Sequence, residues 1–210
     1  MSYGKGPTMD FSGATLWLTG LPGAGKSTIA EAVGESLRGR GARVEILDGD
    51  RLRTNLSADL GFSAEDRAEH VRRTGFVARL LAANGVTVLV PVIAPYSEVR
   101  SGVREQHEAH GCPYFEVHVA TPATECMRRD PKGLYRRAAS GELSGLTGYD
   151  AEYQEPSDPD LRLDTTTADI ATARDTVLDM LERAVTSPAH LSFTESDQEV
   201  LDGDKRLYPL

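Results

Sequence analysis

Residues 20–28, which read GLPGAGKST, restrict the possible folds of this chain more than any other segment. They fit the pattern G-x-x-x-x-G-K-[ST], follow an apolar run at 14–19 and precede a helical pattern at 26–40 that ends at Gly41. The glycines let backbone N–H groups surround phosphate oxygens, and the helix N-terminus adds partial positive charge. The sequence therefore predicts a strand, a phosphate-binding loop and a helix, and with them a nucleoside triphosphate site.

Two side chains of this loop have separate expected roles. Lys26 is expected to reach the β and γ phosphates, and Ser27 to offer its hydroxyl to Mg²⁺. The residues predicted to bind the nucleotide are Gly20, Leu21, Pro22, Gly23, Ala24, Gly25, Lys26, Ser27 and Thr28.

The rest of the chain alternates apolar segments with helical patterns, which is typical of βαβ units and a mostly parallel sheet. A long helix is expected over 63–84, opened by a capping box at Ser63, and others after position 122 and over 167–184. The five predicted strands are residues 14–19, 43–47, 86–92, 114–119 and 161–164. The chain is therefore expected to be an α/β protein.

The third predicted strand ends without an acidic residue, whereas two aspartates follow the second. Motor ATPases and GTPases usually hold Mg²⁺ partly through an aspartate at a strand end, but residues 86–95 contain no acid. Asp48 and Asp50 instead follow the second strand, where parallel strands open into a ligand crevice. Asp48 could accept a proton from an attacking hydroxyl or hold the water shell of the metal. The alternative is a polar turn in which Asp50 caps a helix.

Arginine and lysine gather in two places although the net charge of the chain is −9. Arginine donates paired hydrogen bonds to phosphate or sulfate, so two basic groups indicate two anionic ligands in one cleft. The alternative is that long helices carry solvated arginines. Residues 130–156 are rich in glycine and charge and are predicted to form a mobile lid over the phosphates. The two groups are Arg51, Arg53, Arg67, Arg72 and Arg73, and then Arg128, Arg129, Lys132, Arg136 and Arg137.

Length and composition set the remaining expectations. Residues 13–184 are expected to form one domain, after a disordered start at 1–12 and before an acidic tail at 185–210. The tail is interpreted as a solvated extension, with an arm across a subunit interface as the alternative. The negative charge disfavours general nucleic-acid binding, and the longest apolar run, eleven residues, is far below the ~20 that span a membrane. No targeting signal is recognised, so the protein is expected in the cytoplasm.

The cysteines and histidines carry no predicted chemistry of their own. Cys112 and Cys126 are interpreted as ordinary thiols, because no C-x-x-C spacing is present. No histidine cluster suggests a metal site, and His107 with His110 is interpreted as an exposed helix end.

Six segments in the same order resemble the adenylylsulfate kinases, P-loop enzymes of sulfate activation that phosphorylate the ribose 3′-hydroxyl of adenosine 5′-phosphosulfate. The resemblance covers about residues 12–183 and implies a P-loop NTPase-type three-layer sandwich, a five-stranded parallel sheet flanked by helices. It also implies a homodimer, MgATP as donor and an association with ATP sulfurylase. The segments are GLPGAGKST at 20–28, DGDRLR at 48–53, LGFSAEDRAEHVRR at 60–73, VIAPY at 92–96, RRDPKGLYRRAASGEL at 128–143 and LTGYDAEYQEP at 146–156.

The resemblance also implies individual roles. Asp48 would be the base near the acceptor hydroxyl, with Asp50 beside it, and Lys132 would reach the phosphates from the lid. The other implied contacts are Arg53 and Arg67 on the phosphosulfate, Phe62 on the acceptor adenine, a backbone contact from Ile93, and Arg129 beside the ATP adenine. Lys26, Asp48 and Lys132 are thus the predicted catalytic residues, and Ser27 and Asp48 the predicted metal ligands, Asp48 through water.

Three residues depart from the pattern of the family. His70 stands where asparagine is common, Ala94 where serine is common, and Leu146 where phenylalanine is typical. Ala94 cannot carry a phosphoserine, so no such intermediate is expected. His70 and Leu146 are both assigned to the acceptor site. They leave open a related kinase that acts on another nucleotidyl anhydride or small hydroxylated metabolite, or a non-catalytic nucleotide-binding partner of a sulfate-activating complex.

Overall fold

The computed structural model of the protein describes residues 13–186. The expectations for residues 1–12 and for the tail beyond position 186 lie outside the described residues. In the described part, a five-stranded parallel sheet has the strand order β2-β3-β1-β4-β5. The expected α/β class is therefore confirmed. The strands are β1 (Ala14–Thr19), β2 (Val44–Ile46), β3 (Thr87–Pro91), β4 (Tyr114–Val119) and β5 (Leu161–Leu163).

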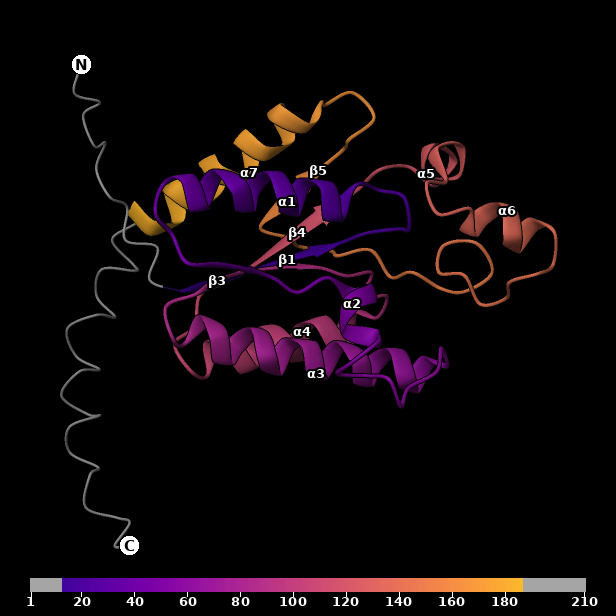
Figure 1. Ribbon diagram of the computed structural model, residues 1–210, viewed down its shortest axis with the longest axis horizontal. Coiled ribbons are helices and arrows are strands. Elements are labelled where there is room, and N and C mark those ends of the chain that lie inside the picture. The colour runs from indigo at the N-terminus through magenta and orange to yellow at the C-terminus, as the bar shows by residue number, and fades with distance from the viewer. Residues whose placement is uncertain (1–12, 187–210) are drawn as a thin grey trace, which may run out of the picture.

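Helices cover both faces of this sheet, which gives three layers (Figure 1). Helices α1 and α7 lie on one face and α3 and α4 on the other, while α5 and α6 lie beyond one end of the sheet (Figure 1). Five helices are α1 (Lys26–Gly39), α2 (Gly49–Arg53), α3 (Ala64–Ala82), α4 (Ser97–Glu108) and α5 (Ala123–Arg129). The other two are α6 (Leu134–Ala139), within the predicted lid, and α7 (Ile170–Thr186).

The central strand β1 is buried on both faces, as expected for a parallel sheet between helices. Leu16 and Leu18 belong to the apolar core on the α1 and α7 side, and Trp17 belongs to the core on the α3 and α4 side. Because Leu18 pairs with Pro91 and Thr19 with His118, the strands end close together. The loops that follow them therefore meet at one edge of the sheet.

Helix α4 has a polar sequence, and only its end, at His107 and His110, is expected from the sequence to be helical. Its buried side chains include Arg100 and His107 beside Val103, so its inner face is not marked by apolar spacing alone. His107 is fully buried, and its ring nitrogens lie 2.8 Å from the Val103 carbonyl oxygen and 3.0 Å from Thr15 Oγ1. The expectation that His107 lies at an exposed helix end is therefore wrong, whereas His110 is exposed.

Both cysteines lie in the part of the chain that the structure describes, residues 13–186. Cys112 and Cys126 are buried and free, as ordinary thiols. Within the same residues, no helix has the length and apolar character needed to cross a bilayer.

Candidate functional site

The phosphate-binding loop connects β1 to α1 and depends on glycine at its two ends. A Cβ at Gly20 would lie 2.4 Å from the Val119 carbonyl oxygen, so no side chain fits there. Gly25 has a left-handed φ of 104° and caps α1 without any side-chain hydrogen bond. The first-turn N–H groups of α1 therefore receive no capping side chain, and they form a site suited to an anion.

Lys26 is held at the mouth of this loop by the loop itself. Its ammonium donates to the carbonyl oxygens of Gly20 and Leu21, both at 2.8 Å. The side chain is buried, and burial lowers the pKa of Lys26 to about 8. These carbonyl oxygens carry no full negative charge, so burying the ammonium among them costs free energy. An anionic ligand would offset this cost.

Asp48 connects the loop to α2. Its Oδ2 accepts a hydrogen bond from Ser27 Oγ at 3.0 Å, and its Oδ1 accepts from the N–H groups of Asp50 and Arg51 at 3.0 and 3.3 Å. The helix cap is thus Asp48, and the alternative in which Asp50 caps a helix is wrong. The Asp50 side chain instead lies in the first turn of α2, because the carboxylate of Asp48, which precedes the helix, already occupies the capping position.

Lys132, from the predicted lid, forms an ion pair with Asp50. The hydrogen bond that Lys132 donates to the Asp50 carboxylate raises the pKa of Lys132. Both side chains are mostly exposed, at 60% and 73%, so the pair contributes little stability and can exchange partners easily. The structure thus brings the predicted residues Lys26, Ser27, Asp48, Asp50 and Lys132 to one edge of the sheet.

Phe62 forms the centre of a second cluster, at the other end of α2. Its ring is 69% exposed, and the guanidinium carbons of Arg53 and Arg67 lie 4.7 and 5.8 Å from its centroid. Arg67 also donates to Thr147 Oγ1 at 2.6 Å and to the Gly145 carbonyl at 2.5 Å. An exposed aromatic ring beside two guanidinium groups suits a ligand that combines a planar base with an anionic group.

The arginines further along α3 do not join this cluster. Arg72 pairs with Glu69, and Arg73 pairs with both Glu69 and Asp59. For these two, the interpretation as solvated helix arginines fits the structure.

His70 and Leu146 are both buried, with 5% and 7% of their surface exposed. The His70 ring lies 3.0 Å from Ser57 Oγ, and Leu146 packs in the core on the α1 and α7 side. Neither side chain offers much surface to a ligand, so their assignment to the acceptor site stays a prediction.

His70 should make the stability of the protein depend on pH. Burial, and then the charge of Arg53, lower the pKa of His70 from its ordinary 6.5 to about 4. Between these values the unfolded chain binds a proton that the folded chain excludes, so stability should fall as pH drops from 6.5 to 4. The slope should be shallower in His70→Asn and unchanged in His110→Asn, a control at an exposed site, when urea midpoints are measured across this range. Equal slopes in His70→Asn and the wild type would contradict this.

The loop after β3 carries Ile93 and Ala94 and is held from several sides. Thr19 Oγ1 donates to the Ile93 carbonyl at 2.5 Å, and Ala94 has a left-handed φ of 44°. Arg100 donates to the carbonyl oxygens of Ala94 and Gln154, at 2.7 and 2.8 Å. The sequence analysis missed Arg100, which is 3% exposed.

Glu116 is the residue from which a buried cationic partner such as Arg100 could have been predicted. The carboxylate lies in the buried strand β4, and its Oε1 is 2.8 Å from Arg100 Nε. A buried acid in such a strand requires a cationic partner.

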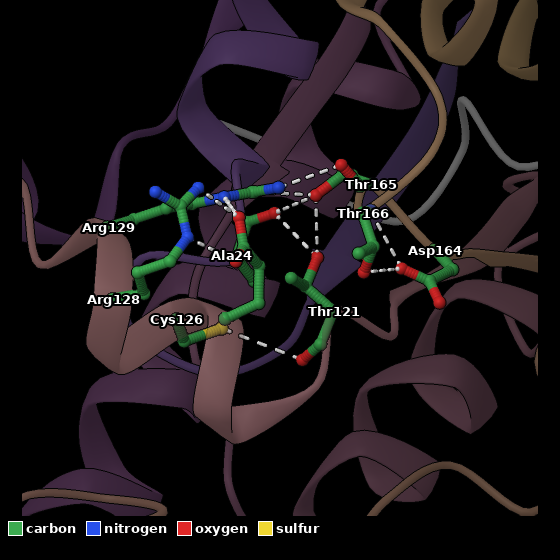
Figure 2. Close-up of polar contacts among 9 residues, drawn as sticks. Ala24, Thr121, Cys126, Arg128, Arg129, Asp164, Thr165 and Thr166 are labelled. Atoms are coloured by element: carbon green, nitrogen blue, oxygen red, sulfur yellow. Dashed lines mark hydrogen bonds and ion pairs between the residues drawn. The ribbon is translucent and has the colours of Figure 1, made fainter.

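Arg129 lies beside the loop that follows β5 (Figure 2). It donates to Thr165 Oγ1 at 2.7 Å, to the Thr165 carbonyl at 2.8 Å and to Glu125 at 2.8 Å. Its neighbour Arg128 pairs with Glu125 in solvent. The predicted role of Arg129 beside the donor base is not tested by these contacts and stays a prediction.

Comparison with known proteins identifies relatives of the whole core. A family model described as adenylylsulphate kinase matches residues 12–164. An adenylyl-sulfate kinase of Picosynechococcus sp. is 50% identical over 157 residues, which are 75% of this chain and 86% of that protein. A bifunctional enzyme CysN/CysC of Mycobacterium tuberculosis is 49% identical over 81% of this chain, which spans only 28% of that longer protein.

A solved structure agrees with these matches. The M. tuberculosis APS kinase CysC, in complex with AMPPNP and APS, has a TM-score of 0.79 and 48% identity, over 81% of this chain and 98% of its own. The family model extends over the phosphate-binding loop, α2 and the Phe62 cluster. The chain therefore belongs to the adenylylsulphate kinase family.

Proposed function

We propose that this protein is an adenylylsulfate kinase, which transfers the γ-phosphate of ATP to the 3′-hydroxyl of adenosine 5′-phosphosulfate. The observation that carries the proposal is the position of α2. At the N-terminus of α2, Asp48 contacts Ser27 of the phosphate-binding loop. At the C-terminus of the helix, Arg53 lies over the Phe62 ring. A helix of five residues spans about 7.5 Å, so donor and acceptor sites adjoin.

The donor side uses the phosphate-binding loop. Backbone N–H groups at the start of α1 bind the phosphate oxygens, and Lys26 turns from the carbonyl oxygens of Gly20 and Leu21 to the β and γ phosphates. Arg129 and the loop after β5 lie beside the base of the nucleotide.

Mg²⁺ fits the oxygen donors at this site. The Ser27 hydroxyl and the Asp48 carboxylate lie 3.0 Å apart, and residues 13–186 contain no cluster of three or more His, Cys, Asp or Glu that would hold a metal without the nucleotide. Mg²⁺ is commonly held by one or two side chains together with substrate phosphates and water. When bound, it would supply positive charge that offsets the negative charge of the donor phosphates.

The acceptor side uses the Phe62 cluster. The adenine stacks on the exposed ring of Phe62, and Arg53 and Arg67 bind the phosphosulfate. The backbone at Ile93, fixed by Thr19, borders the ribose.

Asp48 accepts the proton from the attacking 3′-hydroxyl. Its Oδ2 would be free if the Ser27 hydroxyl served as a ligand of Mg²⁺, while its Oδ1 would still cap α2 and so keep the carboxylate in place. Lys132 leaves Asp50 and follows the transferring phosphoryl group as the lid, residues 130–156, closes.

The test is product formation by purified protein with MgATP and adenosine 5′-phosphosulfate, resolved by chromatography. Adenosine monophosphate and a cytidine diphosphate derivative serve as alternative acceptors. We expect conversion of the phosphosulfate alone, at a typical kinase rate of about 1 to 100 per second. Transfer to another acceptor would favour the related-kinase alternative, and ATP binding without any transfer would favour the non-catalytic one.

The assembly proposed with this function is a cytoplasmic homodimer that associates with ATP sulfurylase. It is supported by the family to which the chain belongs and by the bifunctional relative of M. tuberculosis. Light scattering on the purified protein should give twice the chain mass of 22.7 kDa, whereas a single chain mass would reject the dimer.

A further inference from the structure

We propose that Thr121 and Thr165 are positioning residues that orient the peptide between Ala24 and Gly25, so that the Gly25 N–H faces the donor phosphates. The inference rests on the proposed function in one respect, that the loop binds ATP.

The two hydroxyls meet at one carbonyl of the phosphate-binding loop. Thr121 Oγ1 and Thr165 Oγ1 lie 3.0 and 3.1 Å from the Ala24 carbonyl oxygen and 2.7 Å from each other. Figure 2 shows both hydroxyls directed at Ala24, with the Arg129 guanidinium beside Thr165. Ala24 is fully buried and Thr121 is 3% exposed, so water does not replace these contacts.

Peptide geometry converts this contact into a direction for the next N–H group. The described backbone contains no cis peptide bond, and in a trans peptide the C=O and N–H groups point in opposite directions. Because the Ala24 carbonyl faces the two threonines, the N–H of Gly25 faces away from them. At the left-handed φ of Gly25, this N–H joins the first-turn N–H groups of α1.

Proton counting indicates that the two hydroxyls substitute for each other. The two hydroxyls and the Ala24 carbonyl oxygen make three contacts, but the hydroxyls have only two protons to donate. One hydroxyl can therefore donate to the Ala24 carbonyl and accept a hydrogen bond from the other hydroxyl. Arg129 donates to Thr165 Oγ1 and so does not compete as an acceptor. Either threonine alone can therefore keep the carbonyl satisfied.

The experiment compares Thr121→Val, Thr165→Val and the double variant with the wild type. Binding of MgATP and of inorganic tripolyphosphate is measured by competition against a fluorescent nucleotide. We expect each single variant to stay within about threefold of the wild type for both probes. The double variant should bind both probes about tenfold more weakly or worse, because the buried carbonyl then loses every donor and the peptide can turn.

Two further variants separate this effect from a general disturbance. Thr176→Val removes a hydroxyl that donates to the Thr172 carbonyl on α7; this matched control should bind both probes as the wild type does. The Thr121→Ser, Thr165→Ser protein keeps both hydroxyls and should also bind normally. These variants and the two single variants decide the case even if the double valine variant does not fold.

Several results would overturn the inference. These are a single valine variant that loses tenfold, a folded double variant with unchanged binding, or a double variant that loses affinity for MgATP but not for tripolyphosphate. The last would place the threonines on the base side of the site. Wild-type protein that bound no MgATP would overturn the proposed function as well. Since the readout needs no acceptor, an error in the proposed acceptor would not change the expected pattern.

Discussion

Asp48→Asn should lower kcat by about 10²- to 10⁴-fold, the usual contribution of a general base, and leave the affinity for MgATP within a few-fold of the wild type. An asparagine oxygen can still accept the N–H groups of Asp50 and Arg51, and its amide can still donate to Ser27. The variant therefore removes the proton acceptor and retains the helix cap. Single-turnover transfer and nucleotide binding are the measurements.

Two comparisons make the result specific to the carboxylate. Asp48→Ala also removes the cap of α2, which costs about 1 kcal/mol, so it should be less stable than Asp48→Asn but equally inactive. Asp59→Asn removes an exposed carboxylate that pairs only with Arg73 and should keep full kcat. If Asp48→Asn kept a kcat within threefold of the wild type, Asp48 would not be the base.

Lys26→Met should reduce kcat/KM by at least about 10³-fold while the protein remains as stable as the wild type or becomes more stable. The loss follows from the missing positive charge on the phosphates. The stability follows from burial, which lowers the pKa of Lys26 to about 8 and so makes the charged side chain costly in the folded protein.

Stability and activity are measured on the same preparation, as the urea midpoint and as transfer with MgATP and adenosine 5′-phosphosulfate. Arg40→Met serves as the control, because Arg40 pairs with Glu182 at the surface of α1 and α7, away from the loop. A Lys26→Met protein that is much less stable and equally active would reverse the assignment, and would make Lys26 a structural residue.

Features that depend on local sequence were predictable here. The glycine spacing at 20–28 and the apolar runs of the five strands are local, and the strands lie within one or two residues of their predicted ends. Helix α4 was predicted only at its end, because its inner face includes the polar side chains of Arg100 and His107.

The contacts that complete the site depend on residues far apart in the chain. Ala24 meets Thr121 across 97 positions and Thr165 across 141, and Lys132 meets Asp50 across 82. No periodicity connects such residues, and only the parallel sheet, which gathers its loops at one edge, brings them together. The residues of the candidate site could therefore be named from the sequence, whereas their contact partners could not.

Hydrogen bonds hold the proposed lid at both ends, and this lowers the conformational entropy that the lid loses when it closes. Its first residue, Asp130, donates its N–H to Cys126 of α5, and near its end the N–H of Gln154 donates to Pro95 while Arg100 binds the Gln154 carbonyl. A segment held at both ends has already lost much of the conformational freedom that a free arm would keep. Ordering it over a substrate therefore removes little further entropy, so more of the binding energy of the substrate is available to hold Lys132 over the reacting phosphate.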